Sequence, residues 1–190
     1  MDRNLLSDAA SKGAILGVLM LASHILEQTL MLQGSLSTLM IAVIEMLAVA
    51  VLFVYLVWRF AKRASMEFGD EEVGYSYGQG LLYVITLSVL AGIVVGLGSY
   101  VYMHFIIGYE NYIEKVSAMY SSLLSTAAIP ASVASVYEQM LEQIQSQPEP
   151  SIFGTLWSSL WSYLFWGLIV GLFVAAAVKR DPKLSDENDE

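Results

Sequence analysis

The feature that most constrains this chain is a set of long apolar segments with few or no charged residues. The runs Val73–Tyr109 and Ser151–Val178 contain no Asp, Glu, Lys or Arg. A helix needs about 20 mostly apolar residues to cross roughly 30 Å of hydrocarbon, and two earlier segments meet the same test. The sequence therefore predicts an all-α fold, a polytopic membrane four-helix bundle. We expect a single membrane domain, 1–180, with helices at about 13–33, 38–60, 79–107 and 152–178.

Composition supports the membrane assignment and excludes several kinds of function. Only 14% of the residues are charged, against about 25% in soluble domains. The chain has no cysteine, so disulfides, thiolate nucleophiles and cysteine-based metal centres are excluded. The net charge of -9 argues against nucleic acid as a partner, because phosphate binding requires clustered Lys and Arg. The first partner that we expect is the lipid bilayer.

The positions of the basic residues predict the orientation of the helices. Cytoplasmic loops of membrane proteins carry an excess of Lys and Arg. All but one of the 9 basic residues flank the expected spans on one side, and Lys115 is the exception. We therefore expect both termini in the cytoplasm. The residues on this side are Arg3, Lys12, Arg59, Lys62, Arg63, Lys179, Arg180 and Lys183.

The segment 108–151, between the third and fourth spans, shows apolar residues at helical spacing in two runs separated by Pro130. Such a pattern predicts two amphipathic helices, and we expect an external amphipathic helical hairpin. An alternative is a fifth span over 116–137, which contains no charged residue. Its many Ser and Thr residues, and the outward basic C-terminus that a fifth span would require, favour the hairpin. The acidic tail 181–190 is expected to be disordered.

Two short motifs resemble a known bacterial family. The first is the sequence GYSYGQG from Gly74 to Gly80, which leads into a Gly-rich helix ending near Tyr100-Val101-Tyr102. The second is Val178-Lys179-Arg180, which follows the Gly-rich last helix. Together they resemble an uncharacterised family of four-helix bacterial membrane proteins, over about residues 12–180. The resemblance implies an inner-membrane location and no particular activity.

Ionisable residues within the expected spans are the candidates for a functional site, because each costs energy to place in hydrocarbon. His24, Glu27 and Gln28 share one arc of the first helix, and Glu45 of the second helix is expected opposite them at similar depth. We expect these four residues to form an intramembrane polar cluster. It would respond to protons or cations, or it would hold the helices together through hydrogen bonds. The second interpretation is favoured.

A metal site is a further alternative at this cluster. His24, Glu27 and Glu45 supply nitrogen and oxygen ligands, and His104 is a conceivable fourth ligand. Generic sets of His and carboxylates are common in proteins, so we expect no metal and no other cofactor.

Pairs of glycines four residues apart recur in three of the expected spans. Such spacing lets helix backbones approach closely. The pairs would serve either packing within the bundle, which is favoured, or dimerisation. They are Gly13 and Gly17, Gly92 and Gly96, and Gly167 and Gly171.

No catalytic motif is visible in the sequence, so three functional hypotheses stay open. The first is a non-enzymatic scaffold or accessory subunit, with a homo-oligomer or another membrane protein as its partner. The alternative is a component of a proton- or ion-coupled transporter or channel that uses the polar cluster. A membrane-embedded enzyme is the third, and it lacks a visible nucleophile or nucleotide-binding loop.

Overall fold

The computed structural model describes residues 3–69, 72–126, 131–146 and 148–182, and within them the fold is all-α. Four helices are long and apolar enough to cross a membrane, which confirms the polytopic bundle. Two shorter helices follow the third span. The elements are α1 (Arg3–Met31), α2 (Leu36–Glu67), α3 (Tyr77–Val101), the π-helical turn η1 (Tyr102–Ile107), α4 (Tyr109–Thr126), α5 (Ala131–Ser146) and α6 (Ile152–Val178).

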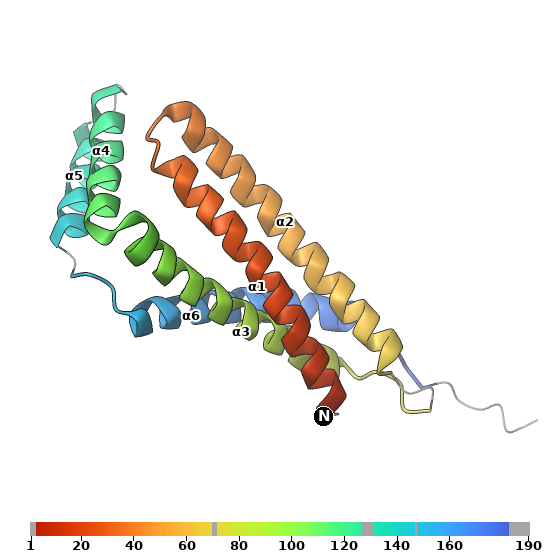
Figure 1. Ribbon diagram of the computed structural model, residues 1–190. Helices are drawn as coiled ribbons and strands as arrows, with labels where there is room; N and C mark the ends of the chain where they lie inside the picture. Colours follow the sequence, from red (N-terminus) through yellow and green to blue (C-terminus); the bar gives the residue numbers. More distant parts are fainter. Residues whose placement is uncertain (1–2, 70–71, 127–130, 147, 183–190) are drawn as a thin grey trace, which may run out of the picture.

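The four spanning helices share one end and diverge toward the other (Figure 1). At the shared end α1 and α3 begin and α2 and α6 end, so we call it the basic end after its Lys and Arg residues. α1 and α2 form one hairpin, and α3 lies alongside both α1 and α6. At the opposite end, the α1–α2 turn meets α4, where Gly34 lies against Met119.

The segment after η1 forms two helices and not a fifth span. α4 and α5 lie against each other, and this packing contradicts the alternative of a single span over 116–137. The two helices pack against each other, and the Gln145 amide donates a hydrogen bond to the Ser117 hydroxyl over 3.3 Å. The acidic tail that was expected to be disordered, 181–190, lies outside the described residues from 183 onward.

Local sequence explains where the helices begin. Ser35, Ser76 and Ser151 each accept a hydrogen bond from a backbone N–H in the first turn of α2, α3 and α6, which satisfies a donor that would otherwise be unpaired. At α3 the backbone N–H of Ser76 donates a hydrogen bond to Gln79 Oε1, which completes a capping box. Gly34 lies in the left-handed region, with φ of 69°, and so permits the tight α1–α2 turn.

The glycine pairs place α3 at the centre of the bundle. A Cβ on Gly13 or Gly17 of α1 would lie 2.7 Å from atoms of α3, the Leu87 carbonyl oxygen and the Val94 Cβ respectively. A Cβ on Gly92 would lie 2.9 Å from Tyr163 Cβ of α6. Gly96, Gly167 and Gly171 likewise lie at the contact between α3 and α6, which we call the α3–α6 seam. All six predicted glycines therefore pack within the chain.

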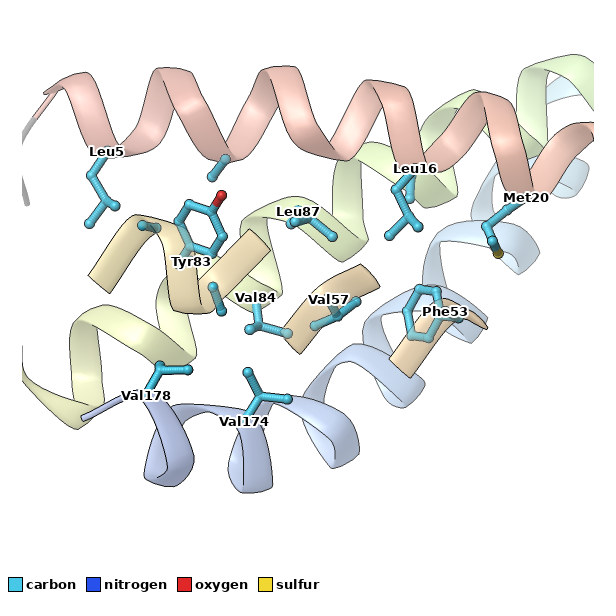
Figure 2. Close-up of a cluster of buried hydrophobic side chains, with 14 of the residues drawn as sticks. Leu5, Leu16, Met20, Phe53, Val57, Tyr83, Val84, Leu87, Val174 and Val178 are labelled. Atoms are coloured by element: carbon cyan, nitrogen blue, oxygen red, sulfur yellow. The ribbon is translucent and has the colours of Figure 1, made fainter. Parts of the chain in front are cut away.

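Buried apolar side chains of α1, α2, α3 and α6 form one core cluster (Figure 2). α1 begins well before the apolar segment that starts at Gly13, and its first turns bury Leu5 and Ala9. Figure 2 shows Leu5, Val57 and Val174 converging from α1, α2 and α6 on the α3 residues that they cover. Removing such apolar side chains from water stabilises the packed bundle.

Candidate functional site

The predicted polar cluster lies on α1 and α2, toward the end that carries the α4–α5 hairpin. Its α1 members are joined to one another. The Gln28 amide nitrogen lies 3.0 Å from His24 Nε2, and His24 Nδ1 lies 3.8 Å from a carboxyl oxygen of Glu27. The spacing of three and four residues brings these side chains to one face of the helix. All three side chains are partly buried.

The connection to α2 is made by a residue that the sequence analysis did not single out. The hydroxyl of Ser23 donates a hydrogen bond to Glu45 Oε1. The structure therefore places Glu45 beside Ser23 and not in a hydrogen bond with His24 or Gln28. A search of the apolar spans for all polar side chains, and not only ionisable ones, would have found Ser23.

Two atoms of the cluster are buried without a hydrogen-bond partner among the described residues, Gln28 Oε1 and Glu45 Oε2. A buried acceptor that lacks a partner costs about 1–3 kcal/mol. The arrangement supports hydrogen bonding between α1 and α2 through Glu45 Oε1, and it leaves Glu45 Oε2 unpaired among the described residues.

The alternative of a metal site is not supported by the geometry. Within the described part of the chain, no three His, Asp or Glu side chains come close enough to hold a metal ion. His104 is engaged elsewhere: its ring nitrogens lie 3.0 Å from the Tyr100 carbonyl oxygen and 3.1 Å from that of Pro150. Glu149 lies 3.3 Å from the same ring. His104 thus ties η1 to the segment before α6.

The structure also shows a junction at the basic end that sequence reasoning missed. Tyr75 and Arg180 exchange two backbone hydrogen bonds, of 2.8 and 3.0 Å, in an isolated antiparallel bridge. The Arg180 guanidinium also donates to the Ser65 carbonyl oxygen over 3.2 Å. A Cβ on Gly74, whose φ is 77°, would lie 2.3 Å from the Arg180 carbonyl oxygen, so only glycine fits there. The junction links the ends of α2 and α6 to the start of α3.

A carboxylate from α1 completes this junction. The Tyr83 hydroxyl points at α1 (Figure 2) and donates to Asp8 over 2.7 Å, and Lys12 lies 3.9 Å from the same carboxylate. Tyr75 is fully buried beside this group. Burial, and to a lesser extent the charge of Asp8, raises the pKa of Tyr75 to about 12. The phenol of Tyr75 is therefore neutral at physiological pH.

The two sequence motifs that carried the family resemblance, Gly74–Gly80 and Val178–Arg180, thus meet in this junction. A family model described as a protein of unknown function, DUF4199, matches residues 12–180. The chain belongs to this family. The DUF4199 match covers α1 from Lys12 onward, the other three spanning helices, and the α4–α5 hairpin between α3 and α6. No curated protein and no solved structure matches the chain.

Proposed function

We propose that this DUF4199 protein is a non-catalytic scaffold or accessory subunit of the bacterial inner membrane, which binds another membrane protein through its α4–α5 hairpin. The observation that carries the proposal is an apolar stripe on α5 that nothing in the described chain covers. Val136 and Met140 lie one turn apart and are 53% and 46% exposed. α5 packs mainly on α4, and this contact leaves about half of each of these two side chains exposed.

The charge of the hairpin indicates the chemistry of the partner. The segment 108–151 carries a single basic residue, Lys115, and five glutamates. Four of the five have exposed side chains on α4 and α5. A partner with a complementary surface would place Lys and Arg around an apolar centre, because complementary charge guides association and apolar contact holds it. The glutamates are Glu110, Glu114, Glu138, Glu142 and Glu149.

The proposed orientation places both termini in the cytoplasm and the hairpin outside, because the basic residues gather at the opposite end of the bundle. The absence of cysteine from the natural sequence makes labelling a direct test, since an introduced thiol is then unique. Ser121→Cys and Ser146→Cys, both at exposed positions of the hairpin, should react with an impermeant maleimide in cells with a permeabilised outer membrane. Glu67→Cys, exposed at the end of α2, should not react. The reverse pattern would invert the topology.

Site-specific photo-crosslinking tests the scaffold function itself. A photoreactive amino acid at position 136 or 140 should give an adduct with one membrane protein of defined mass. The same group in place of Met66, which is exposed at the basic end of α2, should give none. The yield of the adduct should fall as the salt concentration rises, because salt screens the attraction between surface charges. Adducts with lipid alone from both positions would show that the stripe lies on the membrane, and the scaffold proposal would fail.

The second candidate function, proton- or ion-coupled transport, is favoured by the free carboxyl oxygen of Glu45. Reconstituted protein should then conduct protons or cations, and Glu45→Gln should abolish the flux. Infrared spectroscopy should show a carboxyl band that changes during transport and that disappears in the variant. Equal flux from Glu45→Gln and the unaltered protein would remove Glu45 from the transport mechanism.

A further inference from the structure

An apolar groove runs between α2 and α6 and opens sideways from the bundle. It has a volume of about 380 Å³ and is lined almost entirely by apolar side chains, among them Val49 and Phe53 of α2 and Trp166 and Val170 of α6. The two helices diverge on leaving the basic end (Figure 1), so their backbones do not close over it. The only hydroxyl groups on its walls are those of Ser162 and Tyr163, so the groove suits an apolar occupant.

The groove continues along α2 toward the basic end. A second hollow, lined by Ala50, Val51, Val54, Tyr55 and Trp58, shares Ala50 and Val54 with the groove. The two hollows therefore form one apolar track. From Met46 to Trp58 the helix rises roughly 18 Å at about 1.5 Å per residue. This length is close to half of the roughly 30 Å hydrocarbon core, so the track covers about one leaflet.

Two basic side chains, Lys62 and Arg59, lie at the end of this track. Met46, Ala50, Val54, Trp58 and Lys62 follow one another at intervals of four residues and form a single row on α2. The Lys62 ammonium lies 5.0 Å from the centre of the Trp58 ring. Trp side chains prefer the boundary between hydrocarbon and headgroups. Lys62, and Arg59 in the same turn, are exposed at the level where a headgroup would lie.

We infer that this track binds an anionic phospholipid of the leaflet at the basic end. One acyl chain lies along α2 in the groove, and the headgroup contacts Lys62 and Arg59. The occupant is a chain and not a helix, because a helix about 10 Å wide and 18 Å long would occupy on the order of 1,400 Å³, against 380 Å³ in the groove. The charges select an anionic headgroup over a zwitterionic one.

Quenching of tryptophan fluorescence by brominated acyl chains tests this inference. The full chain with Trp157→Phe and Trp161→Phe keeps Trp58 and Trp166, which both line the track. In phosphatidylcholine vesicles, a small fraction of brominated phosphatidylglycerol should quench this emission more strongly than the same fraction of brominated phosphatidylcholine. The difference in apparent association should be about fivefold for each basic side chain in contact. Equal quenching by the two lipids would overturn the proposal.

Three variants of the same protein locate the site. Arg59→Gln with Lys62→Gln should remove the preference for phosphatidylglycerol, while Lys115→Gln, at the other end of the molecule, should leave it intact. Ala50→Phe places a ring where the two hollows meet and should reduce quenching by either lipid. A preference that persists without both basic side chains would refute the headgroup contact. A dimer that Ala50→Phe dissociates would assign the groove to a second copy of the chain.

Discussion

The α3–α6 seam makes a specific prediction about the size of side chain that it tolerates. Gly92 is the most confined α3 glycine at this contact, because a Cβ there would lie 2.9 Å from Tyr163 Cβ and 3.3 Å from Leu160 Cα. Both distances are below the usual 3.5–4.0 Å between carbon atoms. The carbonyl oxygen of Gly92 also accepts a hydrogen bond of 2.9 Å from the Ser159 hydroxyl. Gly92→Ala should therefore push α6 away from α3 and stretch this hydrogen bond.

The magnitude follows from three opposing contributions to the free energy of unfolding. Overpacking of a tight contact costs about 1–3 kcal/mol, and a weakened hydrogen bond between membrane helices costs about 0.6 kcal/mol. Alanine has a higher helix propensity than glycine, which raises the free energy of unfolding by about 1 kcal/mol. The expected net loss is on the order of 1–2 kcal/mol. Gly78→Ala in the same helix is the matched control, because its Cβ would meet only Ser76 Oγ, at 4.0 Å.

Equilibrium unfolding in mixed micelles, followed by the emission of the three tryptophans of α6 (Trp157, Trp161 and Trp166), measures both variants. Gly78→Ala should be as stable as the unaltered protein or up to about 1 kcal/mol more stable, so the two variants should differ by roughly 2 kcal/mol. Equal stability of Gly92→Ala and Gly78→Ala would refute the close approach of α3 and α6. Loss of an oligomer by Gly92→Ala, without loss of stability, would show that the glycine pair joins two copies of the chain.

Three other substitutions test the junction and the polar cluster. Tyr83→Phe leaves Asp8 without its hydrogen bond of 2.7 Å and should lower the free energy of unfolding by about 1.5–3 kcal/mol, measured by the same unfolding assay. Tyr75 keeps its proton up to about pH 12 in the folded state, whereas an unfolded tyrosine loses it at about 10. Stability should therefore fall above pH 10 by about 1.4 kcal/mol per pH unit, and Tyr75→Phe should remove that part of the fall in an alkaline titration. Ser23→Ala leaves Glu45 without its partner and should cost about 1 kcal/mol or less, as hydrogen bonds between membrane helices do; a loss above about 3 kcal/mol would contradict the account of this contact.

The spanning helices could be predicted from sequence because hydrocarbon imposes a minimum length on any apolar helix that crosses it. The sequence predicted a first helix that starts at about residue 13, whereas α1 starts at Arg3. Hydropathy detects the apolar part of a span and does not detect a more polar extension of the same helix. The pattern was nevertheless present, since Leu5, Ala9, Gly13 and Leu16 continue one buried face at helical spacing. A search by periodicity over residues 3–20 would have started the helix near Arg3.

The pairing of distant residues could not be predicted in this way. Tyr75 and Arg180 meet through backbone atoms, which carry no signal of their own in the sequence. Asp8 and Tyr83 are ordinary residues near the ends of two helices, and only the packing of α1 on α3 brings them to 2.7 Å. The glycine pairs could be predicted only in part. Their spacing predicts a close helix contact, but the identity of the facing helix depends on the fold.

α2 is the least buried of the four spanning helices. α1 and α6 are fixed to α3 by glycine contacts over several turns, whereas the buried residues of α2 lie almost entirely in its second half. In its first half, Glu45 holds α2 to α1 through Ser23, among neighbours that are largely exposed. A proton on Glu45 or a lipid in the groove would each change the contacts of α2 and leave the α1–α3 and α3–α6 contacts in place. If α2 takes two arrangements relative to α6, a ligand that binds them with different affinity shifts the equilibrium between them by the difference in binding free energy. We therefore expect any ligand-dependent change of conformation to alter the distance between α2 and α6.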